Sequence, residues 1–161
     1  MISLLMSGLL WFAAIGCGLM AGVYFAFSTF VMSALQRIPP PAGIAAMNAI
    51  NVDIVNSPFI PFFMGTTVAA ALLAVVAVVR WGEPGSLALL AAGILYVLGM
   101  FVVTLAFNVP LNNALAAVDP ASPQGAALWA SYVRDWSVWN HLRTFASLGS
   151  ALLFMLALVA H

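Results

Sequence analysis

The sequence predicts an all-α integral membrane protein, a four-helix up-down bundle that forms a single domain over residues 1–161. Composition is the first reason. Hydrophobic residues make up 65% of the chain and charged residues 5%, against about 25% charged residues in soluble domains. A soluble fold of this length could not bury so much apolar surface. The second reason is that short polar stretches separate four apolar runs. Each run is long enough to cross a bilayer, which takes about 20 residues.

The first apolar run covers residues 3–35. It is longer than the apolar part of a signal peptide, and no small-residue cleavage motif ends it, so we expect a retained span. Arg37 and the three prolines 39–41 end the helix, because proline cannot continue it. Gly18 and Gly22 form a small-xxx-small pair, which predicts close contact with another helix at this point.

The second and third spans have recognisable ends. In "NSPF", Ser57 suits the N-cap of the second span and Pro58 its first helical position. This span continues to Val79, where "RWGEPG" predicts a tight polar turn. The third span begins at Ser86. Pro110 is expected to kink it, because proline removes one backbone hydrogen bond and clashes with the preceding turn.

The fourth helical segment is expected to start with Ser122 as its N-cap and Pro123 as its first residue. No proline follows as far as His161, so one continuous helix of roughly 57 Å is one alternative. The favoured alternative is an interfacial amphipathic piece over about residues 123–135 that bends into a span over about residues 136–159. The first connection, residues 42–56, is too polar to span a bilayer. Its apolar side chains share one face, which predicts an interfacial or re-entrant helix.

An up-down topology brings most of the polar residues to one end of the bundle. The set comprises Tyr24, Ser28, Asn48, Asn51, Asp53, Asn56, Asn108, Asn112, Asn113, Trp136, Trp139, Asn140, His141 and Arg143. At 100° per residue, Asn140 and Arg143 share an arc of roughly 100° with both tryptophans, and His141 lies about 100° from Asn140. An ionisable residue two turns into a span usually faces the interior and has a partner.

Several function classes are excluded by what the chain lacks. The net charge is zero and there is no lysine, so a nucleic-acid partner is not expected. The two histidines, His141 and His161, lie at opposite ends of the predicted bundle, and there is a single cysteine, Cys17. A metal centre therefore lacks ligands. No dinucleotide, P-loop or nucleophile-elbow motif occurs in the sequence.

The polar residues also have structural explanations. Tryptophans at the start of a span commonly anchor it at the membrane surface, and an arginine there can reach the headgroups. Asparagines and a histidine can join helices by hydrogen bonds. Against these stands an apolar cavity that contains a base, a fixed cation, amides and aromatic walls. That combination suits a flat hydrophobic substrate with an acidic hydrogen.

Four motifs carry a family resemblance: "GVYFAFSTFVMSAL", "AMNAIN…NSPF", "FNVPLNNAL" and "W…WNHLR". In this order they resemble the small four-span membrane proteins grouped with the anthrone oxygenases, many of them uncharacterised bacterial proteins. The resemblance covers nearly the whole chain. It implies oxygenation of an anthrone-like phenol to a quinone by dioxygen, without a metal, flavin or other cofactor.

The implied chemistry assigns roles to the polar residues. A base removes a proton from the substrate, and the resulting anion passes an electron to dioxygen, recombines with it and loses water. His141 is the predicted general base, because histidine changes charge near neutral pH, and Arg143 is the predicted oxyanion stabiliser. The predicted substrate-binding residues are Tyr24, Asn108, Asn112, Trp136, Trp139 and Asn140.

Other functions stay open at this point. The chain could be a non-enzymatic membrane protein that binds a quinone or a lipid, or a haem-binding redox subunit. The expected partners are a hydrophobic small molecule, dioxygen and the lipid bilayer, and a homo-oligomer is left open. The expected location is the bacterial inner (cytoplasmic) membrane. The arginines favour a cytoplasmic position for the polar end, because three of the four lie towards it.

Overall fold

A computed structural model describes residues 4–160, and every regular element in that range is helical. The elements are α1 (Leu4–Ala26), a π-helical segment (Phe27–Val31), α2 (Met32–Gln36), α3 (Pro40–Val55), α4 (Phe59–Val79), α5 (Ser86–Tyr96), two π-helical segments (Val97–Val102 and Thr104–Asn108), α6 (Val109–Ala116) and α7 (Pro123–Ala160). Ser3 and His161, which the sequence analysis also considered, lie outside the described residues.

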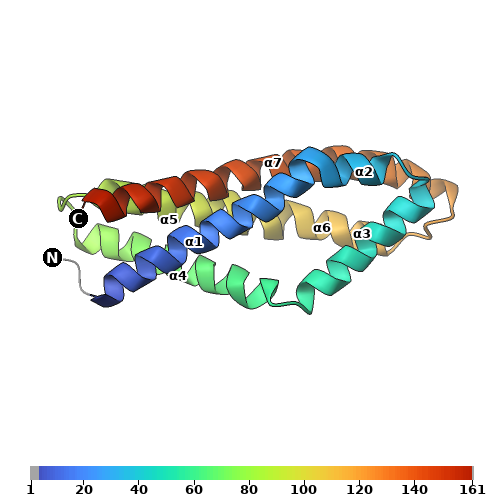
Figure 1. The fold of residues 1–161 in the computed structure, drawn as a ribbon. Helices are drawn as coiled ribbons and strands as arrows, with labels where there is room; N and C mark the ends of the chain where they lie inside the picture. Colours follow the sequence, from blue (N-terminus) through green and yellow to red (C-terminus); the bar gives the residue numbers. More distant parts are fainter. Residues whose placement is uncertain (1–3, 161) are drawn as a thin grey trace.

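Four helical stretches of the described chain are long and apolar enough to cross a membrane: Leu4–Gln36, Phe59–Val79, Ser86–Ala116 and Pro123–Ala160. The predicted all-α fold with four spans is confirmed. Figure 1 shows α1 and α7 side by side along the bundle, with the ends of the chain and the α4–α5 turn at one extremity. The other extremity contains α2, the start of α3 and the connection from α6 to α7 (Figure 1).

The first connection is helical, as predicted. Helix α3 doubles back along the bundle and is followed by α4, which continues towards the chain ends (Figure 1). It packs against α7, α2, α6 and α4. The position of α3 at the membrane surface stays a prediction. The break between α3 and α4 at residues 56–58 leaves a corner in this part of the bundle.

Helix α7 begins where the sequence predicted and then differs from expectation. Pro123 is its first residue, and Ser122 Oγ accepts a hydrogen bond from the Gly125 amide at 3.0 Å. The helix then runs unbroken to Ala160, so the alternative of one continuous helix holds, and the favoured division into two pieces near residue 135 is not observed. Its buried residues recur at helical spacing through both halves, and one straight face therefore packs on α1, α3 and α5.

The third span is irregular before its proline. Two π-helical segments, Val97–Val102 and Thr104–Asn108, precede α6, whose first turn contains Pro110. Proline cannot donate the next backbone hydrogen bond, and wider turns accommodate such a gap. The irregularity expected near Pro110 is therefore present as π-helical turns, and helical structure continues through the proline to Ala116. A sharp bend at this point stays a prediction.

In the half of the bundle that contains the chain ends, small residues let the helices pack closely. A Cβ on Gly16 of α1 would collide with Thr66 Oγ1 of α4, and one on Gly93 of α5 would lie 2.6 Å from the Ala70 carbonyl oxygen. The close contact expected at Gly18 and Gly22 is wrong, because both glycines are exposed and a Cβ there would meet no atom within 4 Å. Helix α1 approaches α4 closely at Gly16, on a neighbouring face of α1.

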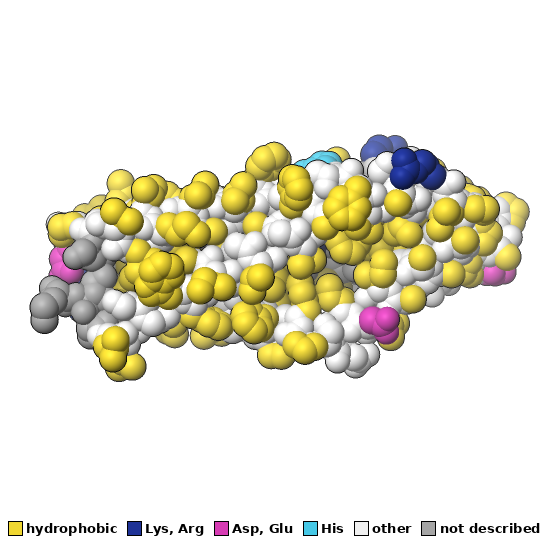
Figure 2. Space-filling view, viewed as in Figure 1, with side chains coloured by type: hydrophobic (Ala, Val, Ile, Leu, Met, Phe, Trp, Pro, Cys, Tyr) yellow, Lys and Arg dark blue, Asp and Glu magenta, His cyan; other side chains and the backbone are white. Residues whose placement is uncertain are grey.

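The outer surface suits a lipid environment. Figure 2 shows hydrophobic side chains over most of one face and only a few charged ones. Many large apolar side chains are exposed along the spans, among them Phe25, Leu72, Leu98 and Phe145. Exposed apolar patches of this extent are rare on soluble monomers. The protein is therefore an integral membrane protein.

Candidate functional site

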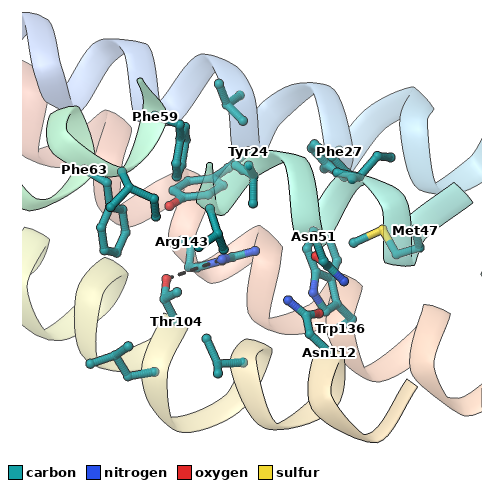
Figure 3. A pocket seen from close by; sticks show the side chains of 17 residues that line it. Tyr24, Phe27, Met47, Asn51, Phe59, Phe63, Thr104, Asn112, Trp136 and Arg143 are labelled. Atoms are coloured by element: carbon teal, nitrogen blue, oxygen red, sulfur yellow. Dashed lines mark hydrogen bonds between the residues drawn. The ribbon is translucent and has the colours of Figure 1, made fainter. Parts of the chain in front are cut away.

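A cavity of about 200 Å³ lies where α1, α3, α4, the third span and α7 meet. Most of its wall is apolar or aromatic, with Phe27, Met47, Phe59 and Phe63 among the lining residues (Figure 3). The polar side chains of the wall are Tyr24, Asn51, Thr104, Asn112, Trp136 and Arg143. Such a lining, with a few placed polar groups in an apolar cleft, is typical of small-molecule sites.

The cavity reaches the outer surface at the corner between α3 and α4. Val55 of α3 and Leu105 of the third span both line it, and their side chains are 62% and 51% exposed. We call this pair of residues the rim. Because both rim side chains are apolar, the opening is hydrophobic. The most exposed part of the wall is thus apolar, whereas Tyr24, Trp136 and Arg143 are buried.

Arg143 is the central polar group of the cavity. Its side chain is only 5% exposed. Nη1 donates a hydrogen bond to Thr104 Oγ1 at 3.3 Å, and Nη2 donates to Asn140 Oδ1 at 2.7 Å. The guanidinium carbon lies 4.4 Å from the centre of the Tyr24 ring and 5.0 Å from that of Trp136. Two neutral acceptors and two aromatic rings thus surround the cation. Figure 3 shows the hydrogen bond between Arg143 and Thr104.

No carboxylate neutralises this buried cation within residues 4–160. The ion pairs of that range join Arg80 to Glu83 and Arg134 to Asp135, both at the surface. Cation–π contacts offset part of the desolvation of a guanidinium. A buried charge without a counterion is nevertheless strongly unfavourable in an apolar environment. The cavity therefore keeps a positive charge that an anionic ligand can neutralise.

Asn140 fixes the position of Arg143. Its side chain is fully buried, and its Nδ2 donates to the Tyr24 carbonyl and to Ser28 Oγ, each at 2.8 Å. With both N–H groups directed towards α1 and the adjoining π-helical segment, the amide oxygen must face Arg143. Ser28 lies in the π-helical segment Phe27–Val31, and Thr104 lies in another. These two π-helical segments thus supply hydrogen-bond partners to Asn140 and Arg143. Such segments are frequent at functional sites.

The structure brings several of the predicted site residues together. Tyr24, Asn112, Trp136 and Arg143 line the cavity, and Asn140 lies behind Arg143. Asn112 Oδ1 accepts a hydrogen bond from the Tyr132 hydroxyl at 2.8 Å. These residues come from three separate segments of the chain. Their convergence follows from the predicted topology.

Two further predicted residues lie elsewhere. Asn108 is buried outside the cavity wall and donates to the Trp136 carbonyl at 3.2 Å, so it joins the third span to α7. Trp139 stacks on Phe107 with 3.7 Å between ring centres and is also absent from the wall. Packing between helices accounts for both side chains. Neither residue lines the cavity, and their expected contacts with a substrate stay a prediction.

His141 is exposed on α7 and does not line the cavity. This corrects its predicted placement in the interior. Helical geometry is the reason, because one residue turns the side chain by about 100° from that of the fully buried Asn140. Among the residues that line the cavity there is neither an imidazole nor a carboxylate. The position of His141 gives no support to a role as general base.

Several lining residues were not selected from the sequence. Thr104 looks like one of many threonines in apolar helices, and Phe27, Phe59 and Phe63 look like core residues. Asn51 was among the polar residues expected at this end of the bundle but was not selected as a substrate contact. Within residues 4–160 no group of three or more His, Cys, Asp or Glu residues could hold a metal ion.

Comparison with known proteins identifies the family. Residues 57–153, more than half of the chain, match the family model described as anthrone oxygenase. The chain belongs to the anthrone oxygenase family. No curated protein and no solved structure matches it. The match to the anthrone oxygenase family includes Thr104, Asn112 and Arg143, so much of the polar wall lies in the part that defines the family. Membership confirms the resemblance and indicates an oxygenase-like function in a membrane.

Proposed function

We propose that the protein is a membrane-embedded oxygenase that binds a hydrophobic, weakly acidic phenol or aromatic ketone as its anion and lets that anion react with dioxygen. One observation carries the proposal: Arg143 is a buried cation without a carboxylate partner in the described chain, and it lines an aromatic cavity. Family membership points to an anthrone-like substrate.

The substrate supplies the missing negative charge. In an anthrone, the methylene group lies between two aromatic rings and opposite a carbonyl group. Loss of a methylene proton gives an anion whose charge spreads onto the carbonyl oxygen. A guanidinium in a dry cavity stabilises such an oxyanion far better than water does. Arg143 therefore favours the ionised, electron-rich form of the substrate.

The reaction with dioxygen needs no further reductant. The anion transfers one electron to dioxygen, and the resulting radical and superoxide combine to form a carbon–oxygen bond. Protonation of this peroxide gives a hydroperoxide. The remaining proton on that carbon then leaves, the oxygen–oxygen bond breaks and water is released. One CH2 ketone and one dioxygen thus give one quinone and one water, with atoms and electrons balanced.

Ionisation of the substrate need not use a side-chain base. No imidazole or carboxylate lines the cavity, and Arg143 cannot accept a proton near neutral pH. The substrate can release its proton to water and bind as the anion, and binding to the fixed cation shifts that equilibrium. The protein then contributes electrostatic stabilisation and orientation between aromatic walls.

The test measures oxygen uptake and quinone absorbance with an anthrone and the purified protein in lipid nanodiscs. Arg143→Gln is expected to lower the rate by about 10²–10³-fold, as for the loss of an oxyanion donor. Arg37→Gln, which changes an exposed arginine outside the cavity, is the control and should match the parent. Spontaneous oxidation is subtracted with empty nanodiscs.

Two results would overturn the proposal. The first is an Arg143→Gln variant that is correctly inserted, as judged by its elution and circular dichroism, and still oxidises the substrate at the rate of the parent. The second is a parent protein that binds the anthrone without oxygen uptake above the background. The latter result would identify a quinone- or phenol-binding protein rather than an oxygenase.

A further inference from the structure

Three buried N–H groups of the cavity-lining residues have no hydrogen-bond acceptor in the described part of the chain. They are Nε of Arg143, Nε1 of Trp136 and Nδ2 of Asn51. The Tyr132 hydroxyl lies near Asn51 but forms no hydrogen bond of good geometry with its Nδ2. Buried polar groups are nearly always paired in folded proteins, so each such group needs an explanation. An indole N–H and a guanidinium N–H can only donate hydrogen bonds. The partner that these groups require is an acceptor.

The unpaired donors lie close together. Figure 3 shows the side chains of Asn51, Asn112 and Trp136 gathered beside the guanidinium of Arg143. The guanidinium carbon is 5.0 Å from the Trp136 ring centre. The neighbouring Asn112 oxygen is already occupied by the Tyr132 hydroxyl at 2.8 Å. One edge of the cavity thus presents donors next to a cation, whereas Phe59 and Phe63 form an aromatic wall.

We propose that Trp136 and Asn51 form a second oxygen-binding subsite next to Arg143. The ligand is then an aromatic anion with two oxygens on one edge of its ring system. Its anionic oxygen binds Arg143, and a neighbouring hydroxyl or carbonyl oxygen accepts hydrogen bonds from Trp136 and Asn51. This inference deepens the proposed function and rests on it for the anionic, aromatic nature of the ligand.

The subsite explains why α3 is part of the site. Asn51 lies on α3, outside the matched family region, whereas Trp136 and Arg143 lie within it. A second oxygen on the ligand would bridge α3 and α7, and the family region alone supplies only the α7 side. A site built to hydrogen-bond an oxygen discriminates against analogues that lack it, because its donors then stay unpaired. The subsite is therefore a determinant of specificity.

The test compares two probes that differ by one oxygen: 1-naphthol and 1,8-dihydroxynaphthalene. Binding to the purified protein in nanodiscs is measured under anaerobic conditions, so the result does not depend on oxygenation. The parent is expected to bind the dihydroxy probe more tightly, and Trp136→Phe should reduce this preference roughly three- to tenfold, as expected for one hydrogen bond. Comparing the affinity ratio between variants cancels the different acidities of the probes.

Trp129 provides a matched control. It is a buried tryptophan on the same helix and does not line the cavity. Trp129→Phe should keep the parent's preference for the dihydroxy probe. Asn51→Leu is a second variant for the subsite, and it should reduce the preference as Trp136→Phe does. Arg143→Gln should weaken the binding of both probes by a similar factor, so the ratio of their affinities should stay nearly unchanged.

The possible outcomes distinguish failure of the subsite from failure of the proposed function. If the parent binds both probes equally, or if Trp136→Phe and Asn51→Leu keep the parent's ratio, the subsite is wrong and the anion site at Arg143 stands. If neither probe binds the parent, both the subsite and the proposed function fail. A ratio that falls in both subsite variants but not in Trp129→Phe supports the second oxygen.

Discussion

The two halves of the bundle achieve stability in different ways. Where the chain ends lie, the core contains many small residues, among them Ala13, Ala14, Ala70 and Ala92, and the helices approach closely. In the other half a separate cluster includes Met32, Met47, Trp129, Tyr132 and Trp136. Bulky side chains hold helices further apart than alanine and glycine do. The cavity with Arg143 lies towards this wider half, next to the break between α3 and α4.

The halves also differ in how polar groups are paired. In the closely packed half, Thr67 donates to the Phe63 carbonyl at 2.8 Å and Ser150 to the Ala92 carbonyl at 3.0 Å. In the wider half, bonds to carbonyls also occur, and in addition side chains bond to one another in a chain that runs from Ser28 through Asn140 and Arg143 to Thr104. The comparison shows that the wider half contains a charged group, Arg143, which is held by neutral hydrogen-bond acceptors and has no carboxylate partner in the described chain.

The largest expected effect comes from giving Arg143 a counterion. Asn140→Asp replaces the neutral oxygen that lies 2.7 Å from Nη2 of Arg143 with a carboxylate. The variant also loses the hydrogen bond that Asn140 Nδ2 donates to the Tyr24 carbonyl, so correct insertion is checked by elution and circular dichroism. The inserted protein should lose affinity for anionic phenols on the order of 100-fold, because the cation is already neutralised. Equilibrium binding of 1-naphthol measures this.

Asn140→Ala serves as the comparison, because it removes the amide and adds no charge. It should lose less affinity than Asn140→Asp. If the aspartate variant binds the phenol as tightly as the parent does, the free charge of Arg143 is not what selects the ligand. The difference between the two halves would then be one of packing alone.

A smaller effect is expected from the closely packed half. Gly93→Ala places a methyl group 2.6 Å from the Ala70 carbonyl oxygen. Such overpacking typically lowers the free energy of unfolding by about 1–3 kcal/mol. Thermal unfolding in detergent measures the loss, and phenol binding by the folded fraction should stay unchanged. Gly18→Ala is the control, because a Cβ there meets no atom within 4 Å and alanine favours the helix. Equal melting temperatures for the two variants would contradict the close approach of α4 and α5.

The smallest effect is expected at the histidine. His141→Gln changes an exposed side chain outside the cavity, so the oxidation rate should change by less than about twofold, far below the 10²–10³-fold typical of an oxyanion donor. The measurement is quinone formation from an anthrone by nanodisc samples. A loss of 100-fold or more would restore His141 as the general base, and it would mean that α7 turns or moves before catalysis.

The fold was largely predictable because hydrophobicity and prolines define the spans. The four apolar runs, the cap at Ser122 and the turn after Val79 gave the helices and their order. The continuity of α7 was the less favoured alternative because residues 123–135 are more polar than the rest of the helix. In the structure, Trp129 and Tyr132 pack against neighbouring helices, so this polar stretch still has a buried face.

The site was predictable only in part. Tyr24, Asn112, Trp136 and Arg143 were correctly expected to lie together, because their chemistry is unusual in an apolar segment and the topology places them at one end. His141 was misplaced because the rarity of a base was given more weight than its angle on the helix. Thr104 and the phenylalanines of the wall could not be found, since only their position distinguishes them from residues that merely fill the core.

The hydrophobic rim of the cavity has a consequence for measurement. Val55 and Leu105 are exposed on the outside and line the cavity as well, and Leu105 belongs to a membrane-spanning stretch. We therefore expect a molecule dissolved in the bilayer to reach this entrance without passing through water. The concentration that governs occupancy is then the mole fraction of substrate in the lipid. Two preparations with the same substrate concentration per litre but different amounts of lipid therefore differ in the mole fraction of substrate to which the protein is exposed.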